Sequence, residues 1–203
     1  MSRQIQKSHH EKIRKKIIAT AQAVAADEGW ESVTMRRLAK EIKYTLPVLY
    51  HYFKSKEDII TQVANAGFLL LLKALEKVST TESIRENVKA YFFAYIDFAQ
   101  QNAGLYQAMY GLNGVSSFTE GNPGEGERIF FTIQKKLEIM KENGAQFESS
   151  WTATKVLWSM LHGLVTLHGV QRIEGPDTQL SDVVEYFTDM VVTTWKMEKM
   201  NNT

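Results

Sequence analysis

The sequence predicts an all-α fold of about nine helices, and three observations lead to this prediction. Apolar residues recur at intervals of three and four along most of the 203 residues, which is the period of an α-helix. The β-branched residues of segment 183–194 are spaced in a helical stripe and do not alternate as in a strand. Glycines end several of the stripes, as at Gly29, Gly144 and Gly175.

The N-terminal third is expected to hold three helices and the start of a fourth. Their apolar stripes are Ile13, Ile17, Ala21 and Val24 in the first; Met35, Leu38, Ala39 and Ile42 in the second; and Leu46, Leu49, Tyr50 and Phe53 in the third. Thr45 is placed to cap the third helix, and Pro47 lies in its first turn, where a missing N–H costs nothing. Ser55 and Asp58 have the spacing of a capping box and begin a fourth helix that runs to about Val78.

Five further helices are expected in the remainder of the chain, over residues 79–102, 103–110, 127–143, 150–171 and 178–199. Ser79 and Glu82 form a capping pair for the first of them. Residues 111–126 contain five glycines and one proline, so we expect a loop there.

Composition excludes several classes of protein. The chain has no cysteine, which removes disulfide scaffolds, cysteine zinc sites and thiol catalysis. Its longest apolar stretch, Gly67 to Leu72, is too short to span a membrane, and no apolar signal-peptide core follows the basic N-terminus. We therefore expect a cytoplasmic protein of one or two domains.

Charge is distributed unequally along the chain. Residues 1–56 hold 12 Lys and Arg against 5 acidic residues, a balance of +7, whereas residues 57–203 hold 12 against 18, a balance of −6. A concentrated positive segment suits a polyanion such as nucleic acid, and an acidic remainder would be repelled from the same phosphates. The alternative is chance clustering on a solvated surface.

The segment from Thr34 to Phe53 has the pattern of a helix-turn-helix. A capped helix, a tight turn and a second short helix match this motif, in which the second helix lies in the DNA major groove. The alternative is an ordinary helical hairpin within a bundle. Two features favour DNA binding: the second helix is too short to be explained by core burial, and His51 and Tyr52 lie near Lys54 and Lys56.

These residues resemble the TetR (tetracycline-repressor-like) family of transcriptional regulators. The resemblance is strong over residues 9–70 and is carried by residues 29–30, 34–39, 49–53 and 54–58. A weaker resemblance to a Trp-His-Gly type of effector domain is carried by residues 95–99, 102–106 and 158–163. The resemblance implies a homodimer with a DNA-binding domain at residues 1–56 and an effector-binding and dimerisation domain at residues 57–203.

The resemblance also implies which residues contact DNA: Thr34, Arg36, Lys43, Thr45, Leu46, Pro47, Val48, Tyr50, His51, Tyr52 and Lys56. Arg36 is similar to a position that reaches a base edge, whereas Tyr50, Tyr52 and Lys56 resemble phosphate-contacting positions. Leu46, Pro47 and Val48 lie nearest the bases and are expected to touch thymine methyl groups, although Leu46 is alternatively a core residue.

The turn departs from the family pattern, because Lys43-Tyr44-Thr45 stands where Gly-Val-Ser is usual. A residue with a side chain must then take a backbone conformation that glycine adopts freely. We expect Lys43 to compensate by reaching a phosphate.

The acidic remainder is expected to hold an effector pocket and a dimer contact. The pocket residues are Phe92, Tyr95, Tyr106, Met109, Trp158 and His162, with Phe98 and Phe130 nearby. The alternative is that these aromatic residues are plain core and that His162 bonds to backbone or water. The last two helices are expected to pair across a homodimer, the final one through Val183, Phe187, Met190, Val191 and Thr194, unless they complete a monomeric core.

An enzyme is not expected, because the sequence shows no nucleophile–base pair, phosphate loop, metal-spaced cluster or paired carboxylates. No cofactor or metal is expected either. The function that the sequence favours is a repressor that a small apolar or aromatic effector releases from a palindromic operator. A protein-binding helix-turn-helix module and a DNA binder without an effector are the rival functions.

Overall fold

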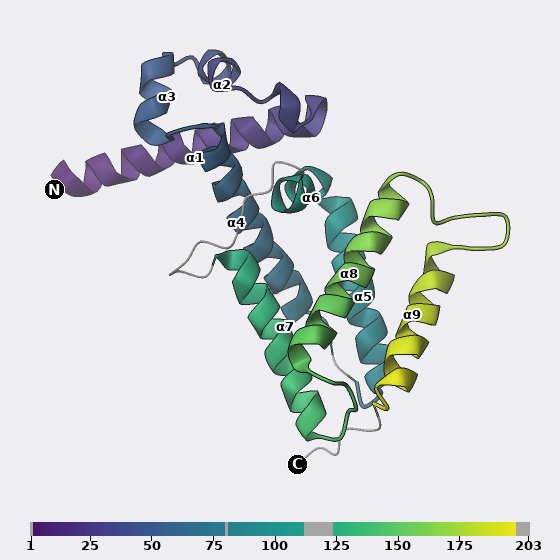
Figure 1. Cartoon of the computed structure of the whole chain (residues 1–203). Coiled ribbons are helices and arrows are strands. Elements are labelled where there is room, and N and C mark those ends of the chain that lie inside the picture. Colours follow the sequence, from purple (N-terminus) through teal and green to yellow (C-terminus); the bar gives the residue numbers. More distant parts are fainter. Residues whose placement is uncertain (1, 80, 112–123, 198–203) are drawn as a thin grey trace. The chain divides into compact units, whose positions relative to one another are not determined.

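The computed structural model describes residues 2–79, 81–111 and 124–197, and over these it contains nine α-helices, one short 3₁₀ helix and no strand (Figure 1). The predicted all-α fold of nine helices is thus confirmed. The helices are α1 Ser2–Glu28, α2 Met35–Ile42, α3 Leu46–Tyr52, α4 Lys56–Glu76, α5 Ile84–Gln101, α6 Ala103–Tyr110, α7 Glu125–Glu142, α8 Ser150–Gly169 and α9 Leu180–Thr194, with η1 at Trp30–Ser32.

Some predicted helix ends are wrong, because other residues cap them. α5 begins at Ile84, where Oγ of Ser83 accepts a hydrogen bond of 3.3 Å from the N–H of Glu86, so Ser79 is not its cap. α9 begins at Leu180, because Gln179 and Asp182 form a capping box. α8 ends at Gly169, two residues before the predicted end at Gln171. Most of the loop expected at 111–126 lies outside the described residues, and α7 begins at Glu125.

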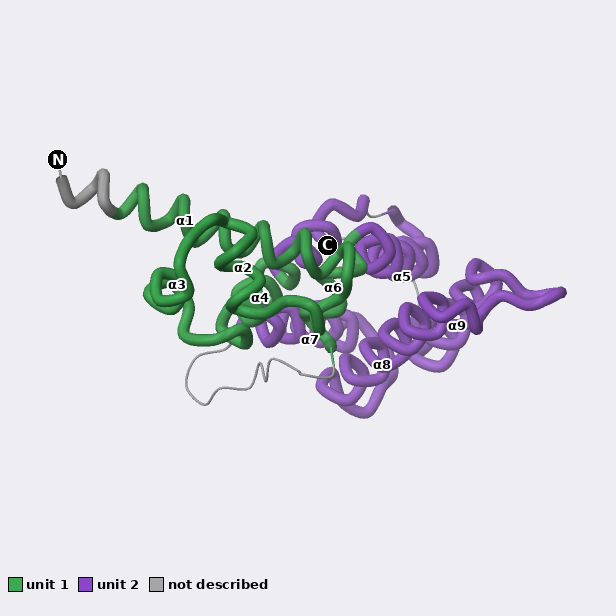
Figure 2. The backbone as a smooth tube through the Cα atoms, turned by 90° about the horizontal axis from the view of Figure 1, so that it is seen from above, with its two compact units in different colours: residues 1–68, 102–116 green, residues 69–101, 117–203 purple. Residues whose placement is uncertain are grey.

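The chain forms two compact units (Figure 2). Unit 1 comprises residues 1–68 and 102–116, and unit 2 comprises residues 69–101 and 117–203. The core of unit 1 contains the stripes predicted for the first three helices: Ile13, Ile17, Ala21 and Val24 from α1; Met35, Leu38, Ala39 and Ile42 from α2; and Leu49 with the adjoining Phe53 from α3. Burial of these apolar faces is what holds three short helices together.

The first part of α4 completes that core. Ile59, Ile60 and Val63 are buried in the same cluster. α4 is also long and apolar enough for a membrane span by length and composition, with a mean hydropathy of 1.4 over its most apolar window. Packing of these three residues in the core of unit 1 accounts for part of that apolar character.

α6 belongs to unit 1 although it follows α5 in the chain. The indole N–H of Trp30 donates a hydrogen bond of 2.9 Å to the carbonyl oxygen of Gly104. Gly67 of α4 lies directly against Met109, since a Cβ atom at Gly67 would lie 2.6 Å from Sδ of Met109. α6 is therefore attached both to η1 and to α4.

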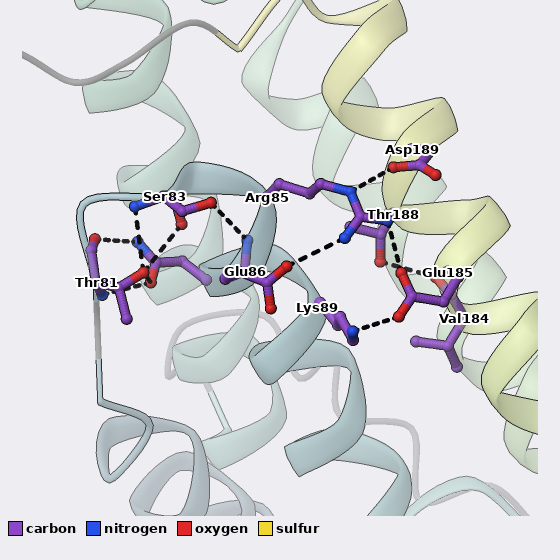
Figure 3. Close-up of polar contacts among 10 residues, drawn as sticks. Thr81, Ser83, Arg85, Glu86, Lys89, Val184, Glu185, Thr188 and Asp189 are labelled. Carbon is purple, nitrogen blue, oxygen red and sulfur yellow. Dashed lines mark hydrogen bonds and ion pairs between the residues drawn. The ribbon is translucent and has the colours of Figure 1, made fainter.

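Unit 2 packs α5 against α8 and α9, and α7 against α8. A group of charged side chains, three of them half-buried, joins α5 to α9 (Figure 3). Arg85 donates from Nη2 to Glu185 and from Nε to Asp189, both at 2.6 Å, and Lys89 also pairs with Glu185. We call Arg85, Lys89, Glu185 and Asp189 the α5–α9 ion cluster.

Candidate nucleic-acid interface

The helix-turn-helix begins with a capped helix. Oγ1 of Thr34 accepts a hydrogen bond of 3.1 Å from the backbone N–H of Arg37, which satisfies one of the N–H groups left unpaired in the first turn of α2. Leu38 is fully buried on the opposite side of the helix from solvent, whereas Thr34 and Arg36 are exposed. The two predicted DNA contacts of α2 therefore lie at the surface.

In the turn between α2 and α3, Lys43 takes the left-handed conformation that a glycine at this position would adopt freely. Lys43 has φ 62° and ψ 41°, in the left-handed region. The N–H of Tyr44 bonds to the carbonyl of Ala39 at 2.9 Å and that of Lys43 to the carbonyl of Lys40 at 3.2 Å, the two bonds of a Schellman motif. These bonds hold a lysine in a conformation that costs about 1 kcal/mol or more for a residue with a Cβ atom.

α3 presents a mostly apolar and aromatic outer face. Thr45, Pro47, Tyr50 and His51 are exposed, and Val48 and Tyr52 are half-buried. Leu46 is half-buried and packs against the core of unit 1, in agreement with the alternative that it is a core residue. Thr45 occupies the N-cap position, but its side chain makes no capping hydrogen bond, so that part of the prediction is wrong.

The cationic side chains nearby have different surroundings. Arg36 and Lys43 are exposed. Arg37 pairs with Glu28 and Glu41 at 2.9 and 2.7 Å, and the hydrogen bond to Glu41 is the main cause that raises its pKa. Nζ of Lys56 donates a hydrogen bond of 2.6 Å to the carbonyl of Trp30. Lys56 thus has a structural role beside the predicted phosphate contact.

Two side chains of α1 donate hydrogen bonds to the last carbonyl groups of α2 and α3, and the sequence analysis identified neither. Nη1 of Arg14 donates to the carbonyl of Tyr52 at 2.6 Å, and its guanidinium lies 4.3 Å from the ring centre of Phe53. Nζ of Lys16 donates to the carbonyl of Ile42 at 3.3 Å. Cations at a helix C-terminus donate hydrogen bonds to its last carbonyl groups and interact favourably with the negative end of the helix dipole. Their position beside the buried stripe of α1 is the signal that could have identified them.

The six residues predicted to bind an effector are divided between the units. Unit 2 contains Phe92, Tyr95, Trp158 and His162, and unit 1 contains Tyr106 and Met109. Phe92, Tyr95, Tyr106 and Met109 are buried, as the alternative of a plain core also predicts. Within unit 2 the Trp158 ring lies 5.9 Å from the Phe130 ring, and burial lowers the pKa of His162 below its ordinary 6.5. Burial therefore favours the uncharged form of the His162 imidazole.

Comparisons with known proteins agree with this geometry. A family model described as bacterial regulatory proteins, tetR family, matches residues 17–63, and one described as tetracyclin repressor-like, C-terminal domain, matches residues 88–193. The chain is 27% identical over 185 residues to an uncharacterized HTH-type transcriptional regulator of Mycobacterium tuberculosis, a match that covers 88% of this chain and 78% of the relative.

Two solved structures share the fold. A protein from Rhodococcus sp. RHA1 superposes with a TM-score of 0.71 at 22% identity, over 90% of this chain and 93% of its own. The TetR family transcriptional regulator PfmR from Thermus thermophilus superposes with a TM-score of 0.61 at 21% identity, over 87% of this chain and 97% of its own.

Proposed function

This chain belongs to the TetR family of bacterial regulatory proteins and is a DNA-binding transcriptional regulator, not an enzyme, and we propose that it is a repressor that a small effector releases from a palindromic operator. We assign DNA binding to residues 1–56, effector binding and dimerisation to residues 57–203, and the cytoplasm as its location. The observation that carries the proposal is the outer face of α3, because burial of Leu49 on the inner face leaves Thr45, Pro47, Tyr50 and His51 exposed.

The side chains of α3 and of the residues around it support a particular set of contacts with bases and phosphates. Pro47 and Val48 offer no side-chain hydrogen bonds, so their contribution is apolar contact with thymine methyl groups and sensitivity to DNA shape. Arg36 is the exposed guanidinium that can pair with guanine N7 and O6. Tyr50, Tyr52, Thr34, Lys43 and Lys56 are assigned to phosphates, which set the register of the protein on the duplex.

The proposed homodimer uses α8 and α9. Exposed apolar side chains follow both helices, namely Val156 and Leu167 on α8 and Tyr186 and Met190 on α9, with Val170 just beyond α8. A monomer rarely leaves a row of large apolar residues in water, and an isologous four-helix contact would bury them. Val191, which was expected on the same face, is buried within unit 2 beside Val184 and Thr188, so the proposed face excludes it.

The proposed effector is apolar or aromatic, because Phe92, Tyr95 and Trp158 are aromatic and His162 carries an imidazole that can form a hydrogen bond. Such an effector lowers DNA affinity only through its higher affinity for the DNA-incompetent state, typically about 1 to 3 kcal/mol of coupling. α4 is the proposed link, since its residues up to Phe68 belong to unit 1 and those from Leu69 to unit 2.

The proposal is tested by footprinting the protein on the DNA that flanks its own coding region. Protection of a two-fold symmetric site, with affinity that falls linearly in log K against log salt, supports it. Binding to no duplex at low salt would contradict it and favour a protein-binding module. A screen of apolar and aromatic compounds by thermal shift then separates a ligand-responsive repressor from a DNA binder without an effector.

A further inference from the structure

Two histidines from different helices meet at the C-terminal end of α3. The ring centre of His10, in α1, lies 4.6 Å from that of Tyr52 and 6.0 Å from that of His51. The rings of His51 and Tyr52 are 5.4 Å apart and nearly perpendicular. In the described part of the chain, neither imidazole forms an ion pair with an acidic side chain.

This arrangement is held by contacts of Arg14 with the end of α3. Arg14, one helical turn after His10, donates to the Tyr52 carbonyl and lies over the Phe53 ring, so α1 is attached to the end of α3 at this level. His51 is exposed and His10 is half-buried, which leaves part of each imidazole accessible to a ligand. The two rings therefore form a defined surface beside the recognition helix.

The surroundings favour an anion. The charged side chains within about one turn of the two histidines in the sequence are Lys7, Glu11, Lys12 and Arg14 in α1 and Lys54 after α3, four cations and one carboxylate. The other titratable groups there are the phenols of Tyr50 and Tyr52. Nearby cations disfavour a further positive charge on an imidazole, whereas an anion that binds between the rings favours it.

We propose that His10 and His51 form a binding site for a phosphodiester group of duplex DNA, and that DNA binding is accompanied by proton uptake at this pair. The inference rests on the proposed function, since it concerns the same DNA surface, and it adds α1 to the helices that contact DNA. A protonated imidazole donates from both ring nitrogens and makes a charge-assisted hydrogen bond to phosphate. Because imidazoles change charge between about pH 5 and 8, the site responds to pH in the physiological range.

The experiment measures the dissociation constant for a fluorescein-labelled random-sequence duplex by anisotropy, at constant ionic strength, between about pH 6 and about pH 8. Wild-type protein is expected to bind about tenfold more tightly at the lower pH, because a protonated imidazole makes a charge-assisted hydrogen bond to phosphate. His10→Gln and His51→Gln should each remove most of this pH dependence. His9→Gln is the matched control, because His9 is the exposed neighbour of His10 in α1.

Several outcomes would overturn the inference. If the wild-type dissociation constant is independent of pH, or if His10→Gln keeps the wild-type pH dependence, the phosphate site is wrong while DNA binding stands. If His9→Gln loses the pH dependence as well, the effect does not arise from the pair. If no variant binds DNA at any pH, the proposed function itself fails.

A second measurement does not depend on comparing affinities of variants. The ring-proton resonances of His10 and His51 are followed through a pH titration with and without the same duplex. Their titration midpoints are expected to move to higher pH when DNA is added, whereas that of His9 moves less. Equal movement of all three would indicate a general electrostatic effect of the DNA and would overturn the site.

Discussion

Nη1 of Arg14 donates a 2.6 Å hydrogen bond to the backbone carbonyl of Tyr52, the last residue of α3. Residues 38 positions apart in the sequence are thereby joined at the end of the recognition helix. The carbonyls of a final helical turn have no partner within the helix, so a guanidinium from α1 supplies one. The orientation of α3 therefore depends on a residue outside the helix-turn-helix.

Arg14→Met should lower the free energy of unfolding by about 1 to 2 kcal/mol, because it removes a charge-assisted hydrogen bond and the contact with the Phe53 ring while keeping the alkyl packing. Urea denaturation measures this. Lys15→Met is the control, since Lys15 is exposed, and it should change stability by about 0.5 kcal/mol or less. Equal effects of the two variants would show that the Tyr52 contact contributes nothing.

Lys43→Gly should stabilise the protein by up to about 1 kcal/mol, because glycine adopts the left-handed conformation without a Cβ penalty. It should also weaken DNA binding and reduce the slope of log K against log salt by about one if Lys43 reaches a phosphate. Lys43→Asn separates the two effects, since asparagine tolerates the same conformation without the charge. A salt slope equal to that of the wild type in both variants would rule out the phosphate contact.

Gly67→Ala should destabilise unit 1 by about 1 to 2 kcal/mol, because its Cβ would lie 2.6 Å from Sδ of Met109. The gain in helix propensity, about 1 kcal/mol, offsets only part of the clash. Adding Met109→Ala should make the Gly67→Ala change less costly than it is alone, which a double-mutant cycle measures. Additive effects would mean that a side chain at position 67 of α4 and Met109 of α6 do not clash.

Leu167→Glu should convert the protein to a monomer and weaken operator binding, because it places a charge in the proposed α8 and α9 contact, where a buried unpaired charge is costly. Sedimentation velocity reports the oligomeric state. Phe131→Glu, at another exposed apolar position of unit 2, is the matched control and should remain dimeric. A dimer that survives Leu167→Glu while Phe131→Glu disrupts it would place the interface on α7.

The α5–α9 ion cluster should make stability fall in acid. Hydrogen bonds from Lys89 and Arg85 lower the pKa of Glu185 below 4.5, and that from Arg85 lowers the pKa of Asp189 below 3.8. The unfolded chain therefore binds more protons, so the stabilisation is present above about pH 4.5 and is lost as the pH falls through the lower folded-state values.

Arg85→Gln tests this contribution. Its Tm should lie a few degrees or less below that of the wild type at about pH 7, since the charges are partly exposed and therefore screened by solvent, and the difference should shrink as the pH is lowered. Thermal unfolding followed by circular dichroism measures both. A difference that stays constant down to about pH 3 would show that Arg85 acts through packing and not through its ion pairs.

The sequence alone determined the number and type of helices and the apolar stripes of the helix-turn-helix, because each depends on residues within a few positions of one another. Periodicity records which face of a helix is buried, so the stripes of α1 and α2 were predicted residue by residue. The left-handed conformation of Lys43 was expected only from the resemblance to the family, in which glycine is usual at that position. Helix starts were predicted less well at α5, where Ser83 caps in place of Ser79, and at α9, where Gln179 and Asp182 form a capping box that was not predicted.

Only the tertiary structure decided which distant groups meet. The bonds from Arg14 to Tyr52, from Lys56 to Trp30 and from Trp30 to Gly104, and the stacking of His10 on Tyr52, join residues far apart in the chain. The division of the predicted effector residues between two units likewise appears only in the fold. Local periodicity specifies the buried face of a helix, but the partner of that face depends on how the helices pack, since many packings bury the same stripe equally well.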